Sequence, residues 1–347
     1  MSIAQDLAAP PAAALAGKRR GAVVILSVLL LTVVVSVLGL GVGSHPVEPR
    51  VALQAVFAYD PTQNEHLIVI SSRLPRIVLG LIAGVALGVS GALIQSVTRN
   101  PLGDPGILGI NAGASLLVCV AIAFLGITSV KGYLVFALLG AALAAGAVHL
   151  LGASRGAAAT GARIALAGTA LSLVLGALTQ MILLGNEGSF ASFRFWAVGS
   201  LQGRGLETSA AVLPLVVAGL LFAYALSGPL DNLVLGDTTA RALGTRAGSV
   251  RALAILAAVL LAGAATAAAG PIGFVGLAAA HLARRVVGSA HRWLIPASAV
   301  FGAACLVCAD ALGRWLVAPA ELQTGIATAL FGAPVFIAVV RSRSAGV

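Results

Sequence analysis

The chain has 347 residues, of which 59% are hydrophobic and only 9% are charged, and its formal net charge is +10 at pH 7. Soluble domains are about half apolar and about a quarter charged, so this chain has too little polar surface to cover a globule in water. The composition excludes an ordinary soluble protein and indicates an integral membrane protein.

The apolar residues form blocks of membrane length, since about 20 helical residues cross a hydrocarbon core of ~30 Å. The blocks are continuous and do not alternate with a period of two, which favours helices over a barrel. We predict an all-α integral membrane fold with about ten spans, at 21–43, 74–97, 106–126, 133–152, 163–184, 207–227, 250–269, 273–287, 295–316 and 323–341. The eighth block is short and flanked by glycine, so nine spans remain an alternative.

The segment before the first span, residues 1–20, is rich in Ala and Pro and is expected to be a disordered cytoplasmic tail. The first apolar block is longer than the core of a signal peptide and has no A-x-A cleavage site after it, so we predict that it is retained. Residues 21–347 are then a single transmembrane domain.

The basic residues predict the orientation. With the N-terminus inside, fourteen of the 21 Lys and Arg residues fall in cytoplasmic segments and seven in outer segments, which favours an N-in, C-in arrangement. The positive charge is accounted for by this asymmetry, and we predict no nucleic-acid partner.

Motifs for catalysis are absent from the sequence. It contains no G-x-x-x-x-G-K-[ST] phosphate loop, no H-E-x-x-H and no G-x-S-x-G, so we predict a non-enzyme that depends on a partner for energy. Cys305 and Cys308 form a C-x-x-C inside a predicted span, where small apolar packing is the favoured interpretation over a redox site. The five histidines show no metal-ligand spacing, and we predict neither a metal site nor a cofactor.

The longest cytoplasmic connection, residues 228–250, has apolar residues outside the membrane. Its leucines and glycines predict a short helix–turn–helix, and apolar side chains on an otherwise polar loop favour a docking surface for a cytoplasmic partner. The residues that define this pattern are Leu233, Leu235, Gly236, Ala240, Leu243 and Gly244.

Two further patterns have both a structural and a functional interpretation. Gly80, Gly84 and Gly88 recur every four positions in the second span, which is typical of close helix packing and would also allow helices to slide. Asp310 and Arg314 are one helical turn apart near the outer end of the ninth span. They either neutralise each other near the membrane, or Arg314 points outward to meet an acidic partner.

The sequence resembles one transporter family over nearly its whole length from about residue 60. The segments that resemble it are RLPRIVLGLIAGVALGVSGALIQSVTRNPLGDPGILGINAGA at 73–114, FWAVGSL at 195–201, LGDTTARALG at 235–244, AAAGPIGFVGLAAAHLARRVVGSAHRWLIPASAVFGA at 267–303, ADALGR at 309–314 and ELQTGIATALFGAPVFI at 321–337. They resemble the FecCD-like permease subunits of type II ABC importers, which serve iron chelates, haem and vitamin B12.

The resemblance implies a multi-pass permease in the cytoplasmic membrane of a bacterium, working with a second permease, a cytoplasmic ABC ATPase dimer and an extracytoplasmic substrate-binding protein. It implies that Arg73, Arg76 and Arg314 receive acidic residues of the binding protein. It also implies a cytoplasmic gate at Asn100 and Leu102. The ATPases would grip the 228–250 connection through Leu235, Gly236, Asp237, Ala240, Leu243 and Gly244.

For the substrate, the resemblance favours an iron(III)–siderophore complex, with haem and cobalamin as alternatives. A homodimer and a paralogous heterodimer of permeases both stay open. An ion-coupled secondary transporter is the alternative from a different class, but it would need ionisable residues at mid-membrane, and the span centres are almost free of them.

Overall fold

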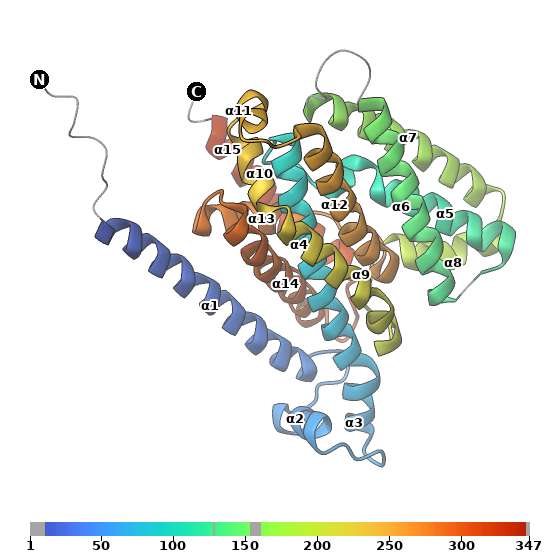
Figure 1. The fold of residues 1–347 in the computed structure, drawn as a ribbon. Helices are drawn as coiled ribbons and strands as arrows, with labels where there is room; N and C mark the ends of the chain where they lie inside the picture. The colour runs from blue at the N-terminus through green and yellow to red at the C-terminus, as the bar shows by residue number, and fades with distance from the viewer. Residues whose placement is uncertain (1–10, 128, 153–160, 345–347) are drawn as a thin grey trace, which may run out of the picture.

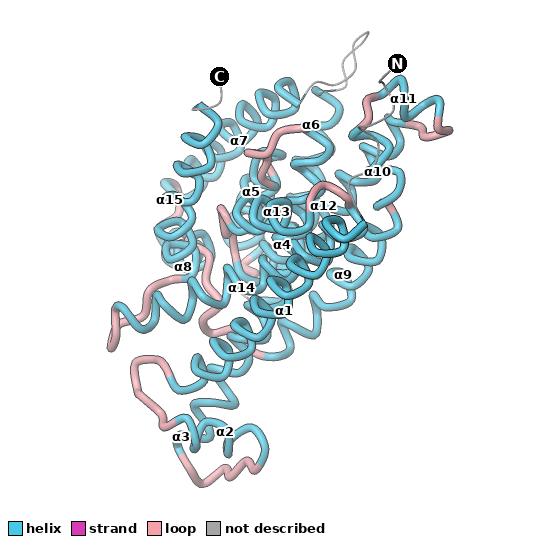
Figure 2. Tube along the Cα trace, turned by 90° about the vertical axis from the view of Figure 1, so that its left-hand side faces the viewer, coloured by secondary structure: helices cyan, strands magenta, loops and turns pink. Residues whose placement is uncertain are grey.

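The computed structural model describes residues 11–127, 129–152 and 161–344, and these residues form helices joined by turns with no strand among them (Figures 1 and 2). The predicted all-α class is confirmed. The longer helices are α1 (Pro11–Gly41), α4 (Leu74–Thr98), α5 (Ile110–Leu125), α6 (Val130–Gly152), α7 (Gly161–Leu184), α9 (Leu206–Ala225), α12 (Ala247–Ala269), α13 (Val275–Val287), α14 (His291–Leu316) and α15 (Thr324–Ser344).

Short helices connect or flank these longer ones. They are α2 (Pro49–Phe57), α3 (Asn64–Ile68), α8 (Glu187–Ala197), α10 (Ser227–Val234) and α11 (Asp237–Ala242). A π-helical turn at Val69–Arg73 makes α3 continuous with α4, and a 3-10 turn at Pro105–Leu108 leads into α5.

Each predicted span overlaps one of the longer helices. Among the described residues seven helical segments are long and apolar enough to cross a membrane, namely Gly21–Gly41, Asn64–Thr98, Gly132–Gly152, Arg163–Leu184, Leu206–Ala225, Ala247–Ala269 and His291–Leu316. Ile110–Leu125 and Thr324–Ile337 are shorter apolar helices. The predicted eighth span is α13, which has only 13 residues, so the number ten stays a prediction.

The N-terminal helix begins earlier than predicted. It starts at Pro11, ahead of the predicted span start at residue 21. The predicted disordered tail therefore has helical backbone in its second half, and residues 1–10 lie outside the described part of the chain.

Helix α4 is the centre of the bundle because its glycines let other backbones touch it. A Cβ atom at Gly88 would lie 2.2 Å from the carbonyl oxygen of Ser298 in α14, and one at Gly84 would lie 2.6 Å from that of Gly302. At Gly91 the same atom would lie 2.2 Å from the carbonyl oxygen of Gly276 in α13. No larger residue fits these contacts, so the predicted role in packing is confirmed for Gly84 and Gly88.

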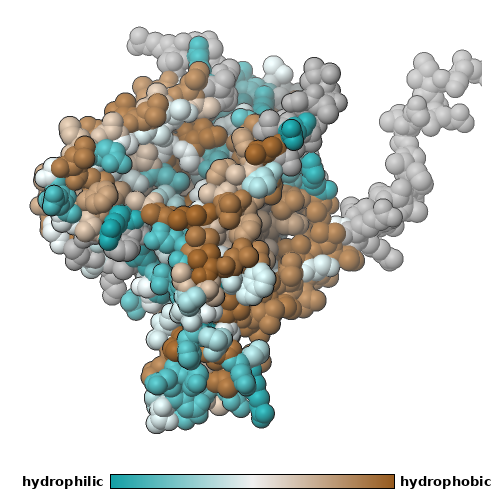
Figure 3. Space-filling model, turned by 180° about the vertical axis from the view of Figure 1, so that it is seen from behind, coloured by the Kyte–Doolittle hydropathy of each residue, from teal (hydrophilic) through white to brown (hydrophobic). Residues whose placement is uncertain are grey.

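The helices differ in how much of their apolar surface the protein itself covers. The apolar windows of α4 and of α12 are 78% buried, whereas those of α1 and α7 are only 17% buried. Figure 3 shows apolar residues over much of the helical body, with polar residues gathered on the extension formed by α2 and α3. An apolar surface of this extent suits contact with lipid or another membrane protein.

The bundle has two polar ends. One, here called the α2 end, contains α2, α3 and the start of α4, and the other, the α10 end, contains α10, α11 and the end of α4 (Figures 1 and 2). Figure 1 places the C-terminus at the α10 end.

Candidate functional site

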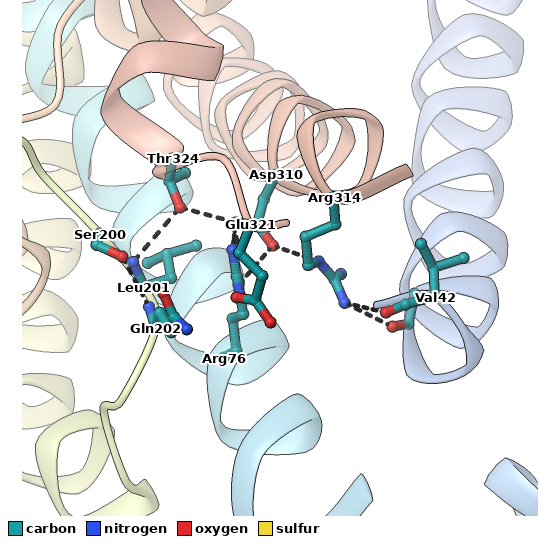
Figure 4. A network of polar contacts seen from close by, with 10 residues as sticks. Val42, Arg76, Ser200, Leu201, Gln202, Asp310, Arg314, Glu321 and Thr324 are labelled. Atoms are coloured by element: carbon teal, nitrogen blue, oxygen red, sulfur yellow. Dashed lines mark hydrogen bonds and ion pairs between the residues drawn. The ribbon is translucent and has the colours of Figure 1, made fainter. Parts of the chain in front are cut away.

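At the α2 end a buried network of charges joins α4 to α14. The guanidinium of Arg76 forms a bidentate ion pair with the carboxylate of Asp310, with Nε 3.0 Å from Oδ2 and Nη2 2.9 Å from Oδ1 (Figure 4). Its Nη1 lies 2.6 Å from Oε2 of Glu321, in the turn before α15. One arginine therefore holds carboxylates that lie 234 and 245 residues further along the chain.

Arg314 completes the network on the other side of Asp310. Its Nε is 3.2 Å from Oδ2 of Asp310, which lies one helical turn earlier in α14. Its Nη1 donates to the carbonyl oxygens of Gly39 and Val42 at the end of α1, at 2.9 and 2.7 Å. Thr324 adds a hydroxyl that donates to Oδ1 of Asp310 at 2.7 Å. The network around Asp310 and Arg314 thus joins α1, α4, α14 and α15.

Arg73 is held separately, by the chain that follows α1. It donates from Nη1 to the carbonyl oxygen of Leu40 at 2.7 Å and from Nη2 to that of His45. Carbonyl groups at a helix C-terminus carry partial negative charge and suit a cation.

The structure places the three predicted docking arginines at one end, but it buries them. Arg73, Arg76 and Arg314 are 5%, 4% and 2% exposed. Of the two interpretations of Asp310 and Arg314, the internal ion pair is present. The participation of Glu321 and Thr324 was missed, because neither belongs to a charged pair that is visible along one helix.

At the α10 end, Asp237 ties α11 to two other helices. Its Oδ1 lies 2.8 Å from Nη2 of Arg99, just after α4, and 2.6 Å from Nη2 of Arg251 in α12. The hydrogen bond from Arg251 lowers the pKa of the Asp237 carboxyl below its ordinary value, with a smaller lowering from Arg99. Asp237 is therefore ionised at neutral pH.

The residues predicted to couple the ATPase divide into three groups. Leu235 and Leu243 are 61% and 56% exposed, whereas Ala240 is buried and Asp237 forms ion pairs with Arg99 and Arg251. Gly236 and Gly244 have positive φ values of 100° and 77°, which form the turns before and after α11. The predicted helix–turn–helix is confirmed as α10 and α11, and Val234, 54% exposed, joins the two leucines as an exposed apolar side chain.

The predicted gate residues lie in a turn that fixes its own shape. The side-chain oxygen of Asn100 accepts from the backbone N–H of Leu102 at 3.0 Å, and its carbonyl oxygen accepts from that of Gly103 at 2.9 Å. Asp104 then accepts from the N–H of Gly106 at 2.8 Å and caps the 3-10 turn. Local side-chain bonds of this kind stabilise tight turns.

The cysteines and histidines are candidate metal ligands because both residue types bind metal ions. Within the described ranges, no group of three or more His, Cys, Asp or Glu side chains could hold a metal ion. Cys119, Cys305 and Cys308 are free thiols. Cys305 and Cys308 line an apolar pocket of about 230 Å³ between α13, α14 and α15.

Comparisons with known proteins agree with the helical bundle. The FecCD transport family model matches residues 29–342. The chain is 42% identical over 317 residues to the ferric enterobactin transport system permease protein FepD of Escherichia coli (strain K12), covering 91% of this chain and 94% of that protein. It is 40% identical over 292 residues to the probable siderophore transport system permease protein YfiZ of Bacillus subtilis (strain 168), covering 84% and 87%.

A solved structure gives the same result for the fold. It is assigned to the metal-chelate type of ABC transporter, in an inward-facing conformation, and it superposes with a TM-score of 0.79 at 29% identity over 92% of this chain and 99% of that chain. The chain therefore belongs to the FecCD transport family and is a non-catalytic, multi-pass permease subunit of an ABC importer in the bacterial inner membrane, where it works with a separate ATPase and a substrate-binding protein.

Proposed function

We propose that this permease translocates an iron(III)–siderophore complex by ATP-driven alternating access. The similarity to permeases named for ferric enterobactin and for siderophores supports this substrate class. The observation that supports an external energy source is the lack of Asp, Glu, Lys and Arg in the centres of the helices. Helix α4 has none between Arg76 and Arg99, and α14 has none between Arg292 and Asp310. An ion-coupled transporter needs a buried relay at that depth.

The substrate is tested by uptake in a strain that lacks this gene, with and without the gene restored. The strain receives labelled ferric enterobactin, a labelled ferric hydroxamate, haem and cobalamin in parallel. We expect restored uptake of at least one ferric siderophore. Restored uptake of haem or cobalamin alone would overturn the iron assignment and leave the permease assignment intact.

The α10 end is the proposed docking site for the cytoplasmic ATPase pair. Leu235 and Leu243 are exposed just after α10 and α11, while the ion pairs of Asp237 tie α11 to Arg99 after α4 and to Arg251 in α12. Exposed apolar anchors on a firmly held base suit a surface that receives force from a partner.

The α2 end is the proposed docking site for the substrate-binding protein, through Arg73, Arg76 and Arg314. Each arginine already has an internal acceptor, so a docking carboxylate would have to replace one. The replaceable acceptor is Glu321, which is 25% exposed and pairs with Arg76, whereas Asp310 is 4% exposed. An incoming acid would take the place of Glu321 in a charge-assisted contact.

The gate at Asn100 and Leu102 is proposed on the basis of position. The turn follows Arg99 directly, and Arg99 is bonded to α11 through Asp237. A movement of α11 would therefore reach the turn through one residue. The second permease, as a copy of this chain or a paralogue, would supply the other half of the pathway.

A further inference from the structure

Four polar side chains meet where α10, α14, α4 and α13 come together, and neither the docking nor the gate proposal uses them. The ring of His291 lies between two of them, with Nδ1 2.6 Å from Oδ1 of Asp231 and Nε2 2.7 Å from Oγ of Ser96. Arg284 donates from Nη2 to the same Oγ at 2.8 Å. His291 is completely buried.

Asp231 fixes α10 to the first residue of α14 twice. Besides the ring contact, its Oδ1 accepts from the backbone N–H of His291 at 2.9 Å. A carboxylate only accepts hydrogen bonds, so Nδ1 of the ring is the donor. A negative charge at a helix N-terminus is also favoured by the helix dipole. Helix α10 and the start of α14 therefore form one unit.

Ser96 extends this unit to the end of α4. It lies three positions before Arg99 and therefore just ahead of the turn with Asn100 and Leu102. A second link from the end of α4 leads to α11, through Arg99 and Asp237, and its arginine side chain is 50% exposed. Exposed ion pairs are weak, whereas breaking a buried hydrogen bond leaves polar atoms without partners. The contact through His291 differs in that its central ring is fully shielded from water, while the Asp231 side chain is 38% exposed.

We propose that His291 is a positioning residue that transmits movement of α10 to α4 and α14 during transport. The imidazole ring is a rigid bridge, so a displacement of Asp231 displaces Ser96 and with it the turn after α4. Helix α14 runs from His291 to the Asp310 network at the α2 end, so the same bridge reaches both ends of the bundle. The inference rests on the proposed docking of the ATPase at α10 and α11.

The test removes one of the two contacts of the His291 ring at a time, in the complete complex with ATPase and binding protein. His291→Asn places an amide near the position of Nδ1 and loses the contact with Ser96. His291→Gln places an amide near the position of Nε2 and loses the contact with Asp231. Ser96→Ala removes one hydroxyl and leaves the histidine in place. The measurements are co-purification of the ATPase, ATP hydrolysis with and without binding protein, and uptake of labelled ferric enterobactin and a ferric hydroxamate.

We expect all three variants to keep the ATPase and its unstimulated rate, while stimulation by the binding protein falls about tenfold, a typical size for coupling between sites. Thr179→Ala is the matched control for Ser96→Ala, since it also removes a buried hydroxyl, but from α7, where Thr179 donates to the carbonyl oxygen of Leu175 within the same helix. This variant should leave stimulation unchanged.

Two results would overturn the proposal. Release of the ATPase by the His291 variants would show that the residue belongs to the docking surface. Normal stimulation of ATP hydrolysis in all three variants would show that the His291 contacts play no part in transport. Docking itself is tested by co-purification with Leu235→Glu, and ATPase stimulation does not depend on which chelate is transported. The experiments therefore give a different result for each proposal that is wrong, whether it is the docking site, the substrate or the role of His291.

Discussion

Glu321 is the residue at which internal pairing and partner docking compete. Arg76 and Arg314 share Asp310 in a buried site, and a buried ion pair that loses one partner costs ~3–5 kcal/mol. Asp310 is therefore needed for folding and is a poor candidate for exchange. Glu321 is more exposed and holds only one edge of Arg76.

Replacing Glu321 with Gln should strengthen capture of the binding protein. The change removes a negative charge that repels incoming acids and weakens the internal competitor for Arg76. We expect an association rate on the order of threefold higher at low ionic strength, with the gain lost at high salt. Surface plasmon resonance with the permease complex in nanodiscs measures this rate.

Glu65→Gln is the control for net charge. Glu65 is an exposed acid in α3 at the same end. Equal acceleration by the two variants would attribute the effect to overall charge and remove the support for docking through Arg76.

At the scale of elements, the contact between α4 and α14 depends on the absence of side chains. We expect Gly88→Ala to destabilise the protein by ~1–3 kcal/mol, because the new methyl group would overlap the carbonyl oxygen of Ser298 and force the helices apart. Thermal unfolding in detergent, followed by intrinsic fluorescence, measures the change.

Gly176→Ala in α7 is the matched comparison. A Cβ atom there meets nothing within 4 Å, and alanine is favoured over glycine in a helix by up to ~1 kcal/mol. We expect an unchanged or slightly raised melting temperature. Equal destabilisation by both substitutions would mean that flexibility, and not close approach, is what Gly88 supplies.

The helices α10 and α11 should bind the ATPase through their exposed leucines. Leu235→Glu or Leu243→Glu places a charge in the centre of an apolar contact and should cost about 2 kcal/mol or ~30-fold in affinity. The ATPase should be lost from the purified complex while the permease remains folded.

The same substitution at the opposite end is the control. Leu53 in α2 is 39% exposed, and Leu53→Glu should leave the ATPase bound. Unchanged co-purification with the variants at Leu235 and Leu243 would contradict the assignment of the α10 end.

For the whole molecule, the predicted orientation places the α2 end outside and the α10 end in the cytoplasm. We expect a cysteine at Thr62 to react with a membrane-impermeant maleimide in intact spheroplasts, and a cysteine at Thr238 to react only after lysis. Both positions are exposed, and the parent with its native cysteines gives the background. The reverse pattern would exclude an N-in arrangement.

A third cysteine tests the number of spans. Ala320 is exposed in the turn between α14 and α15, and the short helix α13 lies between it and Thr238. If α13 crosses the membrane, a cysteine at Ala320 reacts from outside. Labelling only after lysis would leave nine spans, and it would contradict the position of this turn beside Arg76 at the α2 end.

The sequence by itself determined the class of protein, the approximate position of each long helix and the two polar ends. These properties are local, because hydropathy over a membrane-length block follows from neighbouring residues. The spacing of Gly84 and Gly88 by itself also predicted close helix packing. The apolar leucines of 228–250 predicted a structured connection for the same reason, since exposed apolar residues are unusual in a solvated loop.

Only the tertiary structure decided which residues meet and which way they point. Arg76 lies far in the chain from Asp310 and Glu321, and His291 lies far from Asp231 and Ser96. No periodicity relates such positions, because their contacts depend on how whole helices pack. The sequence placed Arg73, Arg76 and Arg314 at one end, yet a count of charges along the chain cannot distinguish an arginine facing a partner from one buried against a carboxylate. That difference is set by the low dielectric of the interior, where a charge without a nearby counter-charge or hydrogen-bond acceptor is too costly to bury.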